Sequence, residues 1–210
     1  MRKRVWRLFA ALAFASLAQV APAATYEYQF SDVFSGDAPG GAAPWAALSF
    51  SDVAGGVAMS LSLNTSLTGN VRQFYFNFDG SAGELDALTF AHSGGDIATI
   101  QTGLNGFKAD GDGLYDILFS YSAGGGFDAG DTSTYLLSGT ELEAGMFNLK
   151  SAETSGNGTT WYAALHVQNI NGAGDSAWMG ATPIPEPETY VLLLAGLGLL
   201  GFAARRRIST

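Results

Sequence analysis

A short acidic segment, Asp110-Gly111-Asp112-Gly113-Leu114-Tyr115-Asp116, carries the side chains best suited to binding a metal ion. Carboxylates stand at alternate positions, Asp110 and Asp112, and a third follows at Asp116. Calcium is bound by several oxygen ligands, which a chain supplies by folding a short, glycine-turned loop around the ion. A calcium site formed by Asp110, Asp112 and Asp116 is therefore the less favoured of two interpretations of this segment, and the sequence suggests no other cofactor.

The same segment resembles the Asp-rich loops of calcium-binding repeats in secreted proteins. Those loops start with an acidic residue two positions before Asp110, where this chain has Lys108. The alternative interpretation is a tight turn that leads into a strand from Tyr115 to Tyr121, with the carboxylates in solvent. A second acidic loop at 128–131 could add a ligand if the fold brought it close.

Catalytic patterns are weak in this chain. His92 and His166 are the only histidines, and there is no cysteine. Zinc chemistry and thiol chemistry therefore have few ligands or none, and no H-E-x-x-H, G-x-S-x-G or Walker sequence occurs. Carboxylate pairs for glycoside hydrolysis need separations that sequence alone does not supply. We do not expect an enzyme.

Tryptophan offers a second kind of site, because its flat ring can contact sugar rings. Trp45 follows a proline and Trp178 precedes Met179-Gly180, so both lie in loop-like surroundings and are predicted glycan contacts on the surface. Trp161 shares parity with Leu165 and Val167 and is predicted to lie in the core.

Alternating apolar and polar residues predict the elements that position these side chains. Period two puts one set of side chains on a core and the other toward water. Gly, Asp, Asn and Ser clusters separate the runs, which predicts short strands joined by turns. We expect an all-β, antiparallel two-sheet sandwich, resembling a jelly roll. The runs are 26–30, 57–63, 74–78, 115–121 and 161–167, with a weaker one inside 45–53.

The C-terminal tail has a layout of its own. Pro185-Glu186-Pro187 precedes an uncharged apolar run, Val191 to Ala204, and Arg205-Arg206-Arg207 follows. A helix is predicted at about 189–204, because the prolines disfavour helix before it. Its apolar length of roughly 15 residues is below the ~20 that span a bilayer comfortably. The arginines are predicted to stop on the cytoplasmic side. A permanent anchor and a buried C-terminal helix are the alternatives.

This order of tripeptide, apolar helix and basic cluster resembles the PEP-CTERM sorting signal of Gram-negative bacteria. The resemblance covers only about the last 27 residues. It implies recognition by exosortase, a membrane enzyme that cuts near the Pro185-Glu186-Pro187 box, so that the helix anchors the protein only transiently. A GPI signal follows the same logic, since its hydrophobic tail is also removed after recognition.

The N-terminus predicts export independently. Arg2, Lys3, Arg4 and Arg7 precede an apolar run, 8–18, and Ala21-Pro22-Ala23 has small residues at the −3 and −1 positions. This is the pattern of a secretory signal peptide cleaved between Ala23 and Ala24, which implies the export translocon and signal peptidase as partners. A first transmembrane helix is the alternative, but the run is short for a membrane span.

The part between the two signals is strongly acidic. Residues 24–182 hold three cationic residues, Arg72, Lys108 and Lys150, against 17 acidic ones, a net charge of −14. Such a domain is repelled by phosphates, so nucleic acid is not expected as a partner. Its stability must come from a packed core because no disulfide can form. Simple solubility also accounts for this charge.

Together these features predict a signal peptide at 1–23, a β-sandwich ectodomain at 24–172, a linker at 173–182 and a sorting signal at 183–210. The expected function is that of an exported surface or extracellular-matrix protein without catalysis, with exopolysaccharide as a candidate partner. The alternative is a surface module that binds calcium or a glycan.

Overall fold

The computed structural model describes residues 23–110, 112–122, 126–154, 159–170, 172, 174–184, 194–197 and 200. Strands dominate these residues, as the all-β prediction required, and every strand pair is antiparallel. The strands are β1 (Thr25–Gly36), β2 (Ala46–Val53), β3 (Gly56–Leu63), β4 (Asn70–Phe76), β5 (Thr89–Gly95), β6 (Thr99–Ala109), β7 (Asp112–Ser120), β8 (Phe127–Asp128), β9 (Thr132–Ser138), β10 (Ala163–Gln168) and β11 (Ser176–Pro183). A short helix, α1 (Ala82–Ala87), and a 3-10 turn, η1 (Ala144–Phe147), complete the domain.

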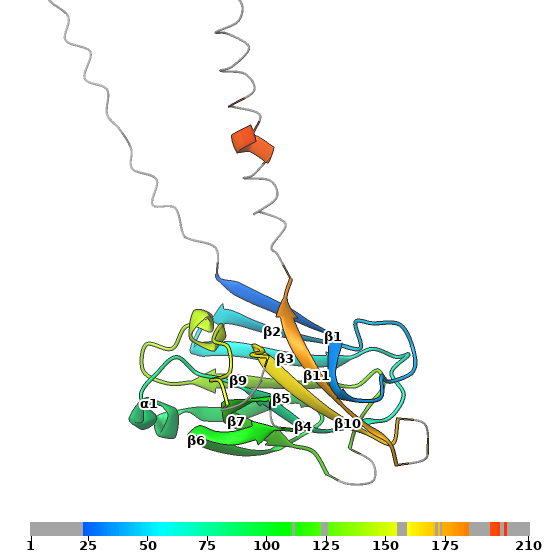
Figure 1. The fold of residues 1–210 in the computed structure, drawn as a ribbon. Helices are drawn as coiled ribbons and strands as arrows, with labels where there is room; N and C mark the ends of the chain where they lie inside the picture. The colour runs from blue at the N-terminus through cyan, green and yellow to red at the C-terminus, as the bar shows by residue number, and fades with distance from the viewer. Residues whose placement is uncertain are drawn as a thin grey trace, which may run out of the picture.

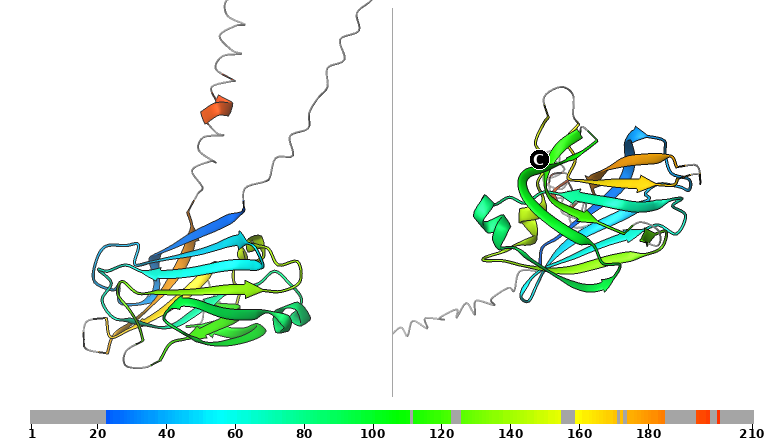
Figure 2. Two further views of the ribbon diagram at one scale, coloured as in Figure 1. Left: turned by 180° about the vertical axis from the view of Figure 1, so that it is seen from behind. Right: turned by 90° about the horizontal axis from the view of Figure 1, so that it is seen from below.

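The strands form one curled sheet, whereas the sequence predicted two separate sheets. The order is β5-β9-β3-β2-β1-β11-β10-β4-β7-β6, and β8 pairs with β4 outside this path. Figure 2 shows how the sheet curves, so that its two halves face each other across the interior. Two layers therefore pack against each other, as predicted. They belong to one sheet, however, because hydrogen bonds between β1 and β11 join them.

Irregular pairing along β1 accounts for the curvature at this junction. The register between β1 and β11 shifts between Phe30 and Asp32 and again between Val33 and Ser35. A β-bulge of this kind bends its strand and increases the local twist. Because β1 lies in the middle of the strand order, its bending turns one half of the sheet toward the other.

Most of the predicted inward residues lie in the core, although the intervening Tyr75, Asn77, Asp116, Leu118 and Ala164 are buried as well. In β3, Val57, Met59, Leu61 and Leu63 are all buried while the residues between them are half-buried. Phe50 of β2 shows that the two halves meet, because its ring lies 5.4 Å from that of Phe76 in β4. Full burial of such a side chain contributes roughly 1.5–3 kcal/mol. The predicted inward residues that are buried elsewhere include Tyr28, Phe30, Phe74, Phe76, Phe78, Tyr115, Ile117, Phe119, Tyr121, Ala163, Leu165 and Val167.

The predicted linker at 173–182 is wrong, because β11 (Ser176–Pro183) occupies most of it. This strand lies between β1 and β10, and Ala177, Met179 and Ala181 are fully buried. The small residues of this segment gave a weak apolar signal, and its Gly and Pro content suggested a loop. The folded domain consequently reaches Pro183, not residue 172.

A six-residue helix, α1, also went unpredicted, and it lies beside β6 (Figure 1). Ser81 caps it: its hydroxyl accepts the amide of Glu84, and the Glu84 carboxylate accepts the amide of Ser81. This capping box was a readable signal in the sequence. The helix is shorter than two turns, so it shows no apolar period.

Candidate functional site

The two ends of the folded domain lie side by side. β1 begins at Thr25 and β11 ends at Pro183, and the two strands are neighbours in the sheet (Figure 1). One residue further, the amide of Ile184 donates a hydrogen bond to the carbonyl of Glu27, at 2.8 Å. Ahead of β1, the carbonyl of Ala24 accepts the amide of Asp52, at 2.9 Å. We call this end of the domain the chain exit.

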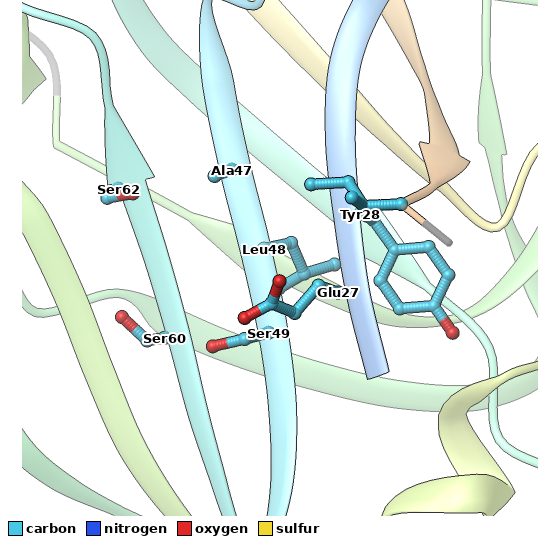
Figure 3. Close-up of a pocket in the computed structure, with 8 residues that line it drawn as sticks. Glu27, Tyr28, Ala47, Leu48, Ser49, Ser60 and Ser62 are labelled. Atoms are coloured by element: carbon cyan, nitrogen blue, oxygen red, sulfur yellow. The ribbon is translucent and has the colours of Figure 1, made fainter. Parts of the chain in front are cut away.

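A shallow hollow of about 160 Å³ borders the chain exit on the outer side of β1, β2 and β3. Glu27 stands directly opposite Ser49 in the pairing of β1 with β2, and its carboxylate extends in that direction (Figure 3). Two further serines of β3 add hydroxyl groups. The hollow is therefore polar, with one carboxylate. Its lining residues are Glu27, Tyr28, Ala47, Leu48, Ser49, Ser60, Ser62 and Ile184.

Beneath the chain exit, Tyr28 acts as a fixed structural group. Its ring packs against Phe50 and Tyr162, and its hydroxyl donates to Asn148 Oδ1 at 2.8 Å. Burial, and then the neighbouring Tyr162 and Tyr26, raises the pKa of Tyr28 far above its ordinary value. The phenol stays neutral, and the start of β1 is held to the loop after η1 (Ala144–Phe147).

The predicted sorting residues themselves lie outside the described residues. This applies to Pro185, Glu186 and Pro187, and equally to Arg205, Arg206 and Arg207. In the tail, residues 194–197 and 200 are described as helical, and Leu194, Leu197 and Leu200 are exposed. Within the described part of the chain, no helix combines the length and the apolar character that crossing a membrane requires. The transmembrane helix at about 189–204 stays a prediction.

The predicted signal cleavage site lies at the start of the domain. Ala23 and Ala24 are exposed and precede β1, while residues 1–22 lie outside the described residues. Cleavage between Ala23 and Ala24 would leave every residue of β1 in the mature chain. The signal peptide and its cleavage stay predictions.

The acidic segment forms the tight turn that was the alternative to a calcium loop. It joins β6 to β7, with Ala109 paired to Asp112, and Asp110 adopts φ 42° at the turn. Asp110 is exposed, and Gly111 and the Asp112 side chain lie outside the described structure. Asp116 lies four residues beyond Asp112 in β7 and is buried, whereas Asp110 is exposed, so the two carboxylates have different surroundings.

Asp116 has a structural role instead. It is 3% exposed, and its carboxylate accepts the amide of Asn105 at 2.6 Å and that of Phe78 at 3.1 Å. The side-chain oxygen of Asn77 accepts the amide of Asp116 at 3.2 Å. These bonds tie β7 to the end of β4 and to an irregular part of β6. Among the described residues, no group of three or more His, Cys, Asp or Glu side chains is placed to hold a metal ion.

The fold brings together a second acidic group, Asp96, Asp128 and Asp131, which the sequence did not indicate. Burial raises the pKa of Asp96, and the negative charges of Asp131 and Asp128 raise it further, while His92 lowers it. Asp131 is engaged locally, because its carboxylate accepts the amide of Asp128 at 3.0 Å. The 128–131 loop therefore lies near Asp96, which follows β5, and not at the predicted calcium turn.

The two histidines lie on different strands and have different surroundings. His92 belongs to β5, where its Nε2 lies 3.0 Å from the carbonyl of Gly95. His166, on β10, is on the outer face as predicted, and its ring stacks on Trp178 with centroids 4.2 Å apart. Burial and the charge of Arg72 lower the pKa of His166, and the charge of Asp110 opposes them.

Two of the three tryptophan predictions, those for Trp45 and Trp161, are wrong. Trp45 is 8% exposed and belongs to the main core, so its prediction as a surface glycan contact is wrong. Trp161 is half-buried outside the strand, because β10 begins only at Ala163, so its prediction as a core residue is also wrong. Trp178, on β11, is half-buried on the outer face, and its prediction as a glycan contact stays open.

A comparison with protein families supports the interpretation of the C-terminal tail as a sorting signal. The model of the PEP-CTERM protein-sorting motif matches residues 183–207. The tail thus carries this sorting motif, which implies export, exosortase processing and a location at the cell surface or outside the cell. No curated protein and no solved structure matches the chain.

Proposed function

We propose that this chain is a non-catalytic protein of the cell surface or extracellular matrix. The export translocon and signal peptidase would release its N-terminus at Ala24, and exosortase would then remove the tail near Pro185-Glu186-Pro187. The C-terminal helix would anchor the protein only until that cut. Exopolysaccharide is the proposed surrounding of the mature domain.

One observation carries this proposal: the sorting motif begins where the folded domain ends. The matched segment starts at Pro183, the last residue of β11. Ile184 is still bonded to Glu27, so the hydrogen bonding of the sheet extends to the residue just before the Pro-Glu-Pro box. A cut at or after Pro185 would therefore release the domain with all its strands, which suits a tail whose purpose is delivery.

The proposal includes the absence of catalytic activity. It is supported by the side chains that could do chemistry, because several of them already have structural partners. Asp116 is occupied by two backbone amides, and Tyr28 is a neutral structural group. His166 is packed against the ring of Trp178. These groups perform structural tasks, which leaves little for acid–base chemistry.

The test is the intact mass of the mature protein isolated from its host, compared with that of a variant in which Pro185, Glu186 and Pro187 are all alanine. We expect the native chain to begin at Ala24 and to end between Ile184 and Thr189. The variant should still lose its signal peptide but keep its tail. Replacement of the exposed Glu143 by alanine is the control and should be processed normally.

Two outcomes would contradict the proposal. A mature native protein that still ends at Thr210 would indicate a permanent anchor. Normal removal of the tail in the triple-alanine variant would show that the box is not what the processing enzyme recognises.

A further inference from the structure

Four ring-bearing residues, Phe34, Trp161, His166 and Trp178, gather on the outer face of the sheet, and we call them the aromatic patch. Trp178 and Phe34 pack against a small buried cluster that is separate from the main core. This cluster consists of Tyr75, Ala109, Tyr115, Leu118 and Ala164. All four residues of the patch are half-buried, so each keeps some exposed surface.

The local irregularities of the chain create the patch. Phe34 lies between Val33 and Ser35, where the pairing of β1 with β11 shifts register. Bulges re-aim a side chain in this way. Its ring reaches both tryptophans, with centroids 6.1 Å from Trp161 and 6.4 Å from Trp178. Phe34 therefore links the two indoles into one surface.

Trp161 lies flat on the sheet because Gly180 has no side chain. A Cβ added at Gly180 would overlap the indole, with Cε2 and Cε3 both 2.5 Å away and Cδ2 nearer still. Cε2 and Cε3 are both neighbours of Cδ2, and their equal, slightly longer distances put the added Cβ above the ring plane near Cδ2. One face of the indole thus covers Gly180 of β11. Any exposed surface of the indole therefore lies on its other face, directed away from Gly180, or along its edges.

Packing alone does not explain why the Trp161 side chain is held in this position. Its indole N–H is buried and makes no hydrogen bond in the described structure. Leaving a buried donor without a partner costs about 1–3 kcal/mol. The side chain is held there at that cost, with one flat face turned outward. Exposed apolar surface rimmed by polar groups is typical of a binding site.

Polar side chains border the patch. On β4, Gln73 pairs directly with His166, and Gln168 continues β10 beyond it. The charges of Asp110 and Arg72 are both close enough to act on His166. Amide, carboxylate and guanidinium groups at the rim supply both donors and acceptors for hydroxyl groups. The ligand they suit is a polar, uncharged molecule that also has an apolar face.

We propose that the aromatic patch binds a neutral β-glucan, a polysaccharide whose pyranose rings carry equatorial hydroxyl groups. Such rings expose C–H groups on their faces, which the negative face of an aromatic ring attracts. Their hydroxyl groups point sideways, toward the polar rim. The net charge of −14 over residues 24–182 disfavours polyanions by repulsion, which selects a neutral polymer. This binding is independent of sorting, so it would persist in a chain whose tail is never processed.

The full chain in detergent micelles tests the proposal. Hydroxyethyl cellulose is cast in a native gel, and cellohexaose is titrated while tryptophan emission is recorded. We expect retarded migration and a saturable change in emission. An alginate gel is the polyanionic comparison and should not retard the chain.

Paired variants locate the site. Trp161→Leu keeps apolar volume but removes the flat ring, and it should weaken apparent affinity about tenfold, since aromatic contacts of this size carry about that much free energy. Trp161→Phe keeps a flat ring and should retain most of the affinity. Phe90→Leu removes a half-buried ring of β5 outside the patch and should change nothing. If circular dichroism shows that Trp161→Leu is unfolded, Phe34→Leu and Phe34→Tyr replace the first pair.

Several results would overturn the proposal. One is a native chain that neither migrates more slowly in hydroxyethyl cellulose nor changes its emission with cellohexaose. Another is undiminished binding by folded Trp161→Leu or Phe34→Leu, which would put the site elsewhere. Retardation by alginate without retardation by hydroxyethyl cellulose would reject a neutral ligand.

Discussion

The amide of Ile184 donates a 2.8 Å hydrogen bond to the carbonyl of Glu27, which ties the last described residue before the Pro-Glu-Pro box to the first strand of the domain. The bond continues the ladder in which β11 pairs with β1. It leaves no flexible spacer on the domain side of the box. A cut at or after the box would therefore leave this hydrogen bond and the whole of β11 in the mature chain.

Removal of β11 is expected to abolish the fold. A chain from Ala24 to Asp175 lacks the strand that joins β1 to β10, and with it the buried Ala177, Met179 and Ala181. The loss of Met179 burial alone is worth roughly 1.5–3 kcal/mol, and the two halves of the sheet lose their hydrogen-bonded connection. Thermal unfolding followed by circular dichroism should show no cooperative transition. The matched chain from Ala24 to Ile184 should melt cooperatively, and a similar melt of both chains would refute this role of β11.

Asp116 is expected to stabilise the domain through its two amide partners. Asp116→Ala leaves the buried amide of Phe78 and the partly buried amide of Asn105 without their acceptor. A buried unpaired group costs about 1–3 kcal/mol and a partly buried one costs less, so the free energy of unfolding should fall by about 1–4 kcal/mol in urea titrations. Asp116→Asn keeps one acceptor oxygen and should lose less. Exposed Asp110→Asn is the control, and a larger loss there than in Asp116→Ala would contradict the assignment.

Calcium is expected to have no effect on stability. Asp116 is buried while Asp110 is exposed at the turn, and both carboxylate oxygens of Asp116 already accept backbone amides. The melting temperature of the full chain should be the same in millimolar Ca²⁺ and in excess chelator. A calcium-dependent rise that Asp110→Asn removes would restore the calcium loop as a site.

His166 should make stability fall as the solution becomes acidic. Burial and Arg72 lower the pKa of His166 in the folded state, so the unfolded chain takes up a proton first as the pH drops. The contribution of His166 is fully present above its unfolded pKa of about 6.5. It is lost as the pH falls from there to the folded pKa. Urea titrations from pH 7.5 to 4.5 should show a smaller decline in His166→Gln than in the native chain. His92→Gln serves as the matched control, and an unchanged decline in His166→Gln would contradict the prediction.

Much of the fold could be predicted from the sequence because it follows local rules. Alternation in 57–63, 74–78 and 115–121 named inward residues that are indeed buried. Small side chains hid β11, since Ala177 and Ala181 give little apolar signal although both are fully buried. Strands β5 and β6 were missed for a related reason, because as edge strands they expose most of their residues.

By itself, the sequence determined the tail motif, the acidic charge and the all-β class, because each depends on the order and type of neighbouring residues. Only the tertiary structure decided which tryptophan faces outward. Trp45 is buried and Trp161 is not, because bulges, strand limits and a glycine on a distant strand set the direction of a side chain. The same holds at the chain exit, where a hydrogen bond between residues far apart in the sequence holds the first residues of the sorting motif, Pro183 and Ile184, at the sheet.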